Sequence, residues 1–237
     1  MVTWISRASA LLILLALPGC LVGGGFGAKG PAPESMTVAG GRVTVAGPAG
    51  YCIDPAASRP GASPAFVLLG SCAGISGQAG APHPDSSAVL TATVSTRALD
   101  GPGVAQSLGV LAAFFKSDDG RAVLARDGQP DSVTVYRTRN GAEALYLRLR
   151  DTSPGALPGT RQTYWRGVFD LNGVLVTLSV IDLADRPISE ATALALLQAF
   201  EDRTRRLTEA GAGPPVLAPV EETAQQPPAN PFAGLLR

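Results

Sequence analysis

The cysteine at position 20 is the residue whose surroundings point most directly to chemistry. A thiolate is a good nucleophile, and Cys20 directly follows the small residue Gly19, at the end of an apolar run from Ala10 to Leu17. Arg7 is the only charged residue before it. A membrane span takes roughly 20 apolar residues, so this run is too short to cross a bilayer but suits an export signal. The pattern predicts an exported precursor that carries a nucleophile at the membrane surface.

The segment Leu17-Pro18-Gly19-Cys20 resembles the lipobox of bacterial lipoproteins. The resemblance implies that residues 1–19 are a cleaved signal peptide, that Cys20 takes a diacylglycerol, and that the lipid holds the mature chain on a membrane. Leu21 stands where inner-membrane retention signals place Asp. By the same resemblance, this implies the periplasmic face of the outer membrane rather than the inner membrane. An ordinary cleaved signal that leaves a free Cys20 is the alternative.

The two remaining cysteines, Cys52 and Cys72, form an even pair in the mature chain. Exported bacterial proteins fold in an oxidising compartment, so this pair is expected to form a disulfide. Asp54, close by, is expected to cap the turn before Pro55, and a ligand-facing Asp54 is the alternative. A structural zinc site has four ligands, and two cysteines with the single His83 do not provide them. We therefore predict a disulfide, with no metal and no cofactor.

Residues that could carry catalysis are scattered. His83 lies between two prolines in a predicted loop, and Ser71 lacks the Gly-x-Ser-x-Gly surroundings of a hydrolase nucleophile. Lys116 and Ser117 are adjacent at a predicted helix end, where neighbouring side chains point apart. The sequence does not pair the carboxylates as glycosidase acids, and these include Asp54, Asp151, Asp170 and Asp182. We predict no catalytic residues, and an enzyme of unrecognised type acting on envelope material is the alternative.

The composition is that of a neutral chain with one folded domain. Its 237 residues carry 19 Lys or Arg and 19 Asp or Glu, so no net field favours nucleic acid. The Gly-rich residues 20–34 predict a flexible lipid tether, and the Pro-rich residues 211–237 predict a disordered tail. The folded domain is therefore expected over residues 35–210, a length that can bury its own core.

The apolar pattern predicts an α+β domain with two helices. One helix is expected from residue 104 to a stop at Gly120, and a second begins after Ser189. Asn140-Gly141 and Asn172-Gly173 separate strand-like runs, which predicts two hairpins with two-residue turns. Further strands are expected at residues 37–38, 42–45, 65–69 and 88–96. The expected fold is an antiparallel sheet of about six to eight strands packed with two helices.

This order of elements resembles the PsbP/Mog1-like fold, which also occurs in envelope lipoproteins of the DcrB type. The resemblance covers the folded domain and rests on the order of strands and helices rather than on a motif. Members of that fold class mostly act as accessory or binding proteins, so the resemblance implies a binding role.

A two-residue turn determines which residues of a hairpin share a face. Around Asn172-Gly173, the face that carries Trp165 and Phe169 is nearly all apolar, so we expect it in the core. Around Asn140-Gly141, Tyr136 is expected opposite Leu145 on a leucine face. The other face then carries Arg137, Arg139, Arg148 and Arg150.

These four arginines, here called the arginine face, are the only charge cluster that the pattern predicts. Burial of the leucine side would force them outward together. One interpretation is a solvated face that prevents pairing at the sheet edge. The other is a docking face for an anion or an acidic envelope partner, because guanidinium groups bind carboxylates and phosphates well.

The predicted function is that of a non-catalytic cell-envelope lipoprotein that acts as a binding or accessory subunit. Its partners would be the membrane, through the N-terminal lipid, and an envelope protein or a small anionic or lipidic ligand, but not nucleic acid. A structural tether and an enzyme are the alternatives. An enzyme requires a pocket in which polar residues with shifted pKa values converge, which a binding scaffold does not need.

Overall fold

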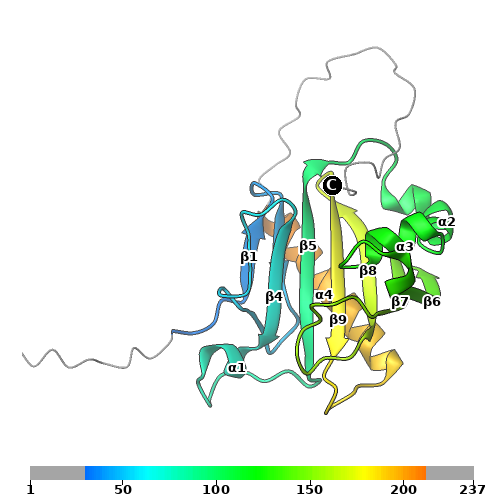
Figure 1. Ribbon diagram of the computed structural model, residues 1–237. Coiled ribbons are helices and arrows are strands. Elements are labelled where there is room, and N and C mark those ends of the chain that lie inside the picture. Colours follow the sequence, from blue (N-terminus) through cyan, green and yellow to red (C-terminus); the bar gives the residue numbers. More distant parts are fainter. Residues whose placement is uncertain (1–29, 212–237) are drawn as a thin grey trace, which may run out of the picture.

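The computed structural model describes residues 30–211. Within this range it contains a seven-stranded antiparallel sheet, a separate two-stranded sheet and four α-helices (Figure 1). The strand order of the large sheet is β3-β4-β5-β9-β8-β7-β6. The predicted class, an α+β domain with one large antiparallel sheet, is confirmed. The predicted signal peptide, Cys20 and the tail beyond Gly211 lie outside the described residues.

The strands and helices have the following bounds. The small sheet consists of β1 (Ser35–Val38) and β2 (Val43–Ala46). The large sheet consists of β3 (Tyr51–Ile53), β4 (Ala65–Ser71), β5 (Ala88–Ala98), β6 (Val133–Asn140), β7 (Ala144–Asp151), β8 (Thr163–Leu171) and β9 (Val174–Asp182). The helices are α1 (Cys72–Ser76), α2 (Val104–Phe114), α3 (Asp118–Leu124) and α4 (Glu190–Gly211), with a 3-10 turn η1 (Pro130–Ser132).

The helix predicted to run from residue 104 to Gly120 is in fact two helices. The α2 helix ends at Phe114, and Ser117 begins α3 by accepting a hydrogen bond from the Gly120 amide at 3.2 Å. Gly120 therefore lies inside α3 and does not end a helix. A Cβ atom at Gly120 would collide with the carbonyl of Phe114, so the glycine permits the close turn between the two helices.

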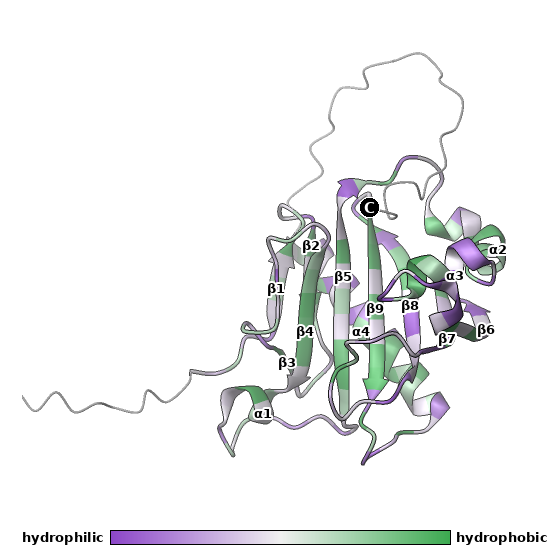
Figure 2. Cartoon of the chain, in the orientation of Figure 1, coloured by the Kyte–Doolittle hydropathy of each residue, from purple (hydrophilic) through white to green (hydrophobic). Residues whose placement is uncertain are grey.

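The α4 helix buries the face of the sheet that the sequence predicts as core. The β8–β9 pairing sets Trp165 opposite Val180 and Phe169 opposite Val176, as expected for a two-residue turn. Together with Leu197 and Phe200 of α4, these residues form the larger apolar cluster. Figure 1 shows α4 running across this face of the sheet, and Figure 2 shows that β9 is predominantly hydrophobic. A fully buried side chain of this size contributes about 1.5–3 kcal/mol.

A buried polar network also holds α4 on the sheet. The Tyr146 hydroxyl of β7 donates to Glu201 at 2.7 Å, and Glu201 accepts from Arg205 at 2.8 Å. The Arg205 guanidinium lies 4.3 Å from the ring centroid of Phe169. Burial, with Glu201 as the next cause, raises the pKa of Tyr146. At its other end α4 holds the small sheet, where the Thr44 amide donates to Thr208 at 2.9 Å.

The opposite face of the sheet is covered only in part. Leu145, Leu147 and Leu149 of β7 point to this side and pack in a second cluster that includes Leu111 of α2. Asp170 of β8 fixes the start of α2, because its carboxylate accepts from the Val104 amide at 2.7 Å. The α2 and α3 helices thus cover the sheet near β7 and β8 (Figure 1). No helix among the described residues covers the part formed by β4 and β5.

The two Asn-Gly turns behave differently. Leu171 pairs with Val174, so Asn172-Gly173 is the predicted two-residue turn, and both residues have positive φ. The same prediction for Asn140-Gly141 is wrong. Asn140 pairs with Leu145, and residues 141–144 form a longer loop in which the Gly141 amide donates to the Ala144 carbonyl at 2.7 Å. The register then shifts at Tyr136, where β6 has a bulge.

Cys52 and Cys72 form a disulfide, as predicted, with their Cα atoms 4.7 Å apart. The bond joins β3 to the start of α1, and the two cysteines are 20 residues apart in the sequence. Asp54 caps the following turn, as expected, by accepting from the Ala56 amide at 2.9 Å. The Ile53 amide donates to the Pro33 carbonyl at 2.7 Å, so the last residues of the predicted tether pair with β3.

Replacing both cysteines by alanine is expected to lower the free energy of unfolding by about 3 kcal/mol, because the unfolded chain regains the entropy of an open loop. Urea denaturation of the wild type and of the Cys52→Ala/Cys72→Ala variant measures this difference. Dithiothreitol should destabilise the wild type by a similar amount and leave the variant unchanged. A wild type with the same urea midpoint with and without dithiothreitol would contradict the prediction.

Candidate functional site: a groove on the open face of the sheet

A groove of about 740 Å³ lies on the face of the sheet opposite α4. Side chains of β4, β5, β9 and β8 form its floor. The segment from Phe115 to Arg126, the loop before β8 and the loop before β4 form its walls. Sites for small molecules usually measure about 300–1,000 Å³, so the groove is of a size to bind one.

The strand register arranges the floor in two rows that run across the strands. Thr91 of β5 pairs with Ser179 of β9, and Thr93 pairs with Thr177. These four hydroxyl-bearing residues occupy the centre of the floor. Leu68 and Phe66 continue the rows on β4, and Arg166 and Val168 continue them on β8. The floor therefore has an apolar end at β4, a hydroxyl-rich centre and an end with a cation at β8.

The threonine hydroxyls of the floor are free to bind a ligand. Thr91, Thr93 and Thr177 are half-buried, and their hydroxyls make no hydrogen bond to any described residue. Only Ser179 is engaged, since its oxygen accepts from Arg166. Polar groups that lie in a partly apolar cavity gain most from a ligand that can hydrogen-bond with them.

Arg166 is held rigidly by three neutral acceptors. Its Nε donates to Ser179 at 3.2 Å, Nη1 to the Leu124 carbonyl at 3.1 Å, and Nη2 to the Tyr164 hydroxyl at 2.9 Å. No carboxylate of the described residues forms an ion pair with it. Burial raises the pKa of Tyr164, which therefore stays neutral beside the guanidinium. Arg166 thus keeps an uncompensated positive charge in the groove.

The groove as a whole is positively charged. Arg59, Arg126, Arg161 and Arg166 line it, with Asp151 as the only carboxylate in its lining. Arg126 pairs with Asp151 at 2.8 Å, and Arg161 lies 3.8 Å from Asp182. Arg59 and Arg166 have no carboxylate partner in the described part of the chain. A partly enclosed site with excess positive charge attracts anions.

The buried carboxylate of Asp151 fixes one wall of the groove. Its side chain is fully buried, pairs with Arg126, and accepts from the Ser153 amide at 2.9 Å. Arg126 also donates to the Ser153 carbonyl at 2.7 Å, and the Ser153 hydroxyl donates to Asp127 at 3.0 Å. Hydrogen bonds from the Gln129 amide, Ser132 and Ser153 lower the pKa of Asp127. These contacts fix the chain at the end of β7, where it leaves the sheet to form the groove wall.

The register places Arg137, Arg139, Arg148 and Arg150 on one face of β6 and β7, with Leu145, Leu147 and Leu149 buried on the other. The helix α4 lies on the same side of the sheet as these arginines. Arg137, Arg139 and Arg150 are exposed. Because of the bulge at Tyr136, Val133 and Val135 lie on the leucine face.

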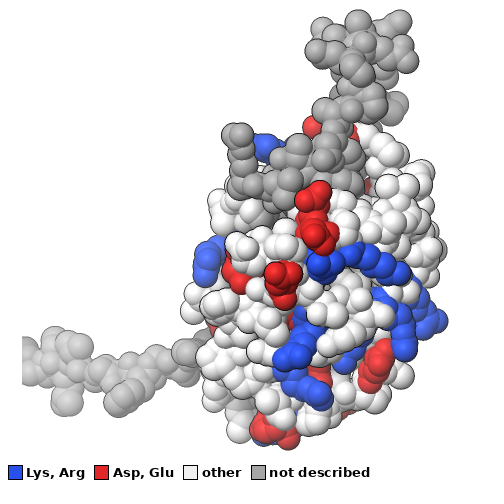
Figure 3. All heavy atoms as spheres, turned by 45° about the vertical axis from the view of Figure 1, so that its right-hand side comes forward, with Lys and Arg blue, Asp and Glu red and all other residues white. Residues whose placement is uncertain are grey.

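The members of the arginine face also have different environments. Arg137 pairs with Glu190 of α4 at 2.9 Å, and Arg150 donates to Gln162 at 3.2 Å. Arg148 is half-buried, and burial lowers its pKa. Arg139 is exposed. Figure 3 shows Lys and Arg side chains gathered on the side of the molecule where β6 lies, with acidic side chains among them.

The other residues considered for catalysis lie at the surface or stabilise helix ends. His83 is exposed in the loop between α1 and β5. Ser117 caps α3 and Asp170 caps α2. Within residues 30–211, no group of His, Cys, Asp or Glu side chains is arranged to hold a metal ion. None of the helices in this range is long and apolar enough to cross a membrane.

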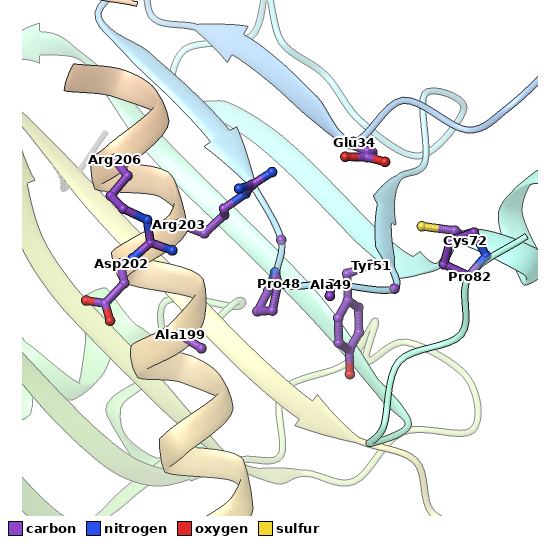
Figure 4. A pocket seen from close by; sticks show the side chains of 12 residues that line it. Glu34, Pro48, Ala49, Tyr51, Cys72, Pro82, Ala199, Asp202, Arg203 and Arg206 are labelled. Carbon is purple, nitrogen blue, oxygen red and sulfur yellow. The ribbon is translucent and has the colours of Figure 1, made fainter. Parts of the chain in front are cut away.

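A second pocket of about 460 Å³ lies between α4 and the disulfide. Figure 4 shows Arg203, Arg206 and Asp202 on α4, with Glu34 and Cys72 on the other side. The two arginines are matched by two carboxylates, so this pocket has no excess charge. The groove on the open face differs in being larger and positively charged.

No family model matches the chain, and a search of curated proteins finds no match. The groove is therefore the feature that bears most directly on function. The sequence contained one signal for it, namely the polar face of the β8–β9 hairpin with Arg166, Thr177 and Ser179. Nothing in the sequence shows that Thr91 and Thr93 lie beside that face, because strand order decides it.

Replacing Asp151 by asparagine is expected to lower the free energy of unfolding by about 1.5–3 kcal/mol, the usual worth of a hydrogen bond to a charged group. Urea denaturation measures the change. Asp100→Asn is the matched control, because Asp100 is exposed and makes no ion pair or hydrogen bond with a described residue. Equal effects of the two substitutions would contradict the role assigned to Asp151.

Proposed function

We propose that this chain is a non-catalytic cell-envelope lipoprotein that binds a small amphipathic molecule in the groove on the open sheet face. The observation that supports the proposal is the floor of the groove. It combines threonine hydroxyls that bond to no described residue with the apolar side chains of Phe66 and Leu68. No described side chain fills this space. A ligand with both apolar and hydrogen-bonding parts would satisfy both kinds of surface.

The sheet provides a rigid support for such a site. The floor residues belong to the central strands β5 and β9, whose other face is buried under α4. Floor positions on paired strands are held by the backbone ladder, so the hydroxyls keep their spacing without a ligand. A largely preformed site loses little conformational entropy on binding.

Two further parts of the proposal concern the fold family and the location. We propose that the domain is PsbP/Mog1-like, because it has the expected order of strands and helices around one antiparallel sheet. We propose lipidation at Cys20 and attachment to the periplasmic face of the outer membrane, from the lipobox resemblance and Leu21. The groove would then act in the envelope, where amphipathic molecules are abundant.

Binding in the groove is tested with a neutral apolar fluorophore, N-phenyl-1-naphthylamine, and a variant that blocks the floor. Thr93→Trp places a large side chain at the centre of the floor. Because drug-sized ligands bury most of their surface in such a pocket, we expect this variant to bind the fluorophore at least about tenfold more weakly. A fluorescence titration measures the affinity. Thr134→Trp, at an exposed position on β6, is the matched control and should bind like the wild type.

Equal binding by the wild type and Thr93→Trp would show that the fluorophore does not enter the groove and would overturn the proposed site. Circular dichroism should show that both tryptophan variants keep the fold. Thr93 is only half-buried, so its replacement is expected to be tolerated.

Lipidation is tested in cells that express the full chain. Globomycin, which inhibits the lipoprotein signal peptidase, should make the precursor accumulate. Cys20→Ala should abolish labelling by an alkyne-bearing fatty acid, whereas the control Cys52→Ala should still be labelled. Normal processing in the presence of globomycin would contradict the proposal.

A further inference from the structure

We propose that the groove selects an amphipathic acid and that Arg166 binds its carboxylate. The ligand class is an acid with hydrogen-bonding groups next to the carboxylate and an apolar tail, as in an N-acyl amino acid. The inference rests on the proposed binding function, and it adds the charge, the chemical class and the orientation of the ligand.

Arg166 has hydrogen-bond donors that no described residue uses. A guanidinium has five N–H donors, and three of them are used by Ser179, Leu124 and Tyr164. Nη1 and Nη2 each retain one N–H. A carboxylate is planar and accepts two parallel hydrogen bonds from such a pair, whereas neutral acceptors bind it less strongly.

Arg166 also differs in its surroundings from the other arginines of the groove. Arg126 and Arg161 are each next to a carboxylate, and Arg59 is exposed at the rim. Arg166 alone is half-buried, rigidly held and without a carboxylate partner in the described part of the chain. Charge interactions strengthen as water is excluded, so an anion gains most at Arg166.

The positions of Arg166 and Leu68 at opposite ends of the floor determine how a ligand would lie. Arg166 lies on β8 and Leu68 on β4, with β9 and β5 between them. Three strand spacings of about 4.8 Å separate the two ends by about 14 Å. A ligand that places its carboxylate on Arg166 therefore runs across the strands. Its polar groups pass over Thr91, Thr93 and Thr177, and its tail reaches Phe66 and Leu68.

A matched pair of probes tests the charge selection. N-decanoylglycine and N-decanoylglycinamide differ only in carboxylate against carboxamide, and each can be titrated by displacement of N-phenyl-1-naphthylamine. The wild type should bind the acid about tenfold more tightly than the amide, the usual gain from charge-assisted hydrogen bonds. The preference should fall as salt is added, because salt screens the charge.

Substitutions test whether Arg166 is responsible for the preference for the acid over the amide. Arg166→Gln should bring the acid-to-amide ratio close to one, and Arg166→Lys should keep part of it, because lysine retains the charge but not the planar pair of donors. Arg59→Gln is the matched control and should keep most of the preference, since it removes an exposed arginine of the same groove. Circular dichroism checks that each variant is folded.

The outcomes separate this inference from the proposed function. If the wild type binds acid and amide equally while Thr93→Trp still blocks the fluorophore, charge selection is wrong and the groove remains a binding site. If Arg59→Gln removes the preference and Arg166→Gln does not, the assignment to Arg166 is wrong. If Thr93→Trp has no effect on any probe, the proposed function itself fails.

Discussion

The burial of one face of the β8–β9 hairpin under α4 is the interaction on which the rest of the structure depends. Trp165, Phe169 and Phe200 are fully buried there, and each such side chain contributes about 1.5–3 kcal/mol. Because side chains alternate along a strand, burying this face determines that Tyr164, Arg166, Thr177 and Ser179 project to the opposite side. The polar floor of the groove is thus a consequence of how the apolar core packs.

On the face opposite α4, helices cover only part of the sheet. The α2 and α3 helices pack against the leucines of β7, and Asp170 ties the start of α2 to β8. No helix of residues 30–211 covers the part of the same face formed by β4 and β5, and the groove lies over this part and the neighbouring side chains of β9 and β8. The groove therefore combines a rigid floor with walls made partly of loops, which is a common arrangement for binding sites.

Arginines on both sides of the molecule pair with carboxylates. On the α4 side, these include the Arg137–Glu190 and Arg205–Glu201 pairs. On the groove side, Asp151 fixes the wall through Arg126, and Arg166 has no carboxylate partner among the described residues. A protein with no net charge thus has a local positive site, and overall composition does not show it.

Several local features of this protein can be predicted from its residues alone. The Asn172-Gly173 turn, the apolar face of β8–β9, the α4 helix and the disulfide could all be predicted, because each depends on neighbouring residues or on an even count of cysteines. The α3 helix was missed because it is short and depends on a single cap at Ser117. For Asn140-Gly141, the turn dipeptide favoured a tight turn that the chain does not form.

The position of the groove depends on the tertiary structure. Strand order brings Thr91 and Thr93 of β5 beside Thr177 and Ser179 of β9, which are more than 80 residues further along the chain. Strand order also places the arginine face on the side of the sheet where α4 lies, so that Arg137 pairs with Glu190. Such pairings depend on which surfaces bury the most apolar area in the whole domain, and residue spacing along the chain does not contain that information.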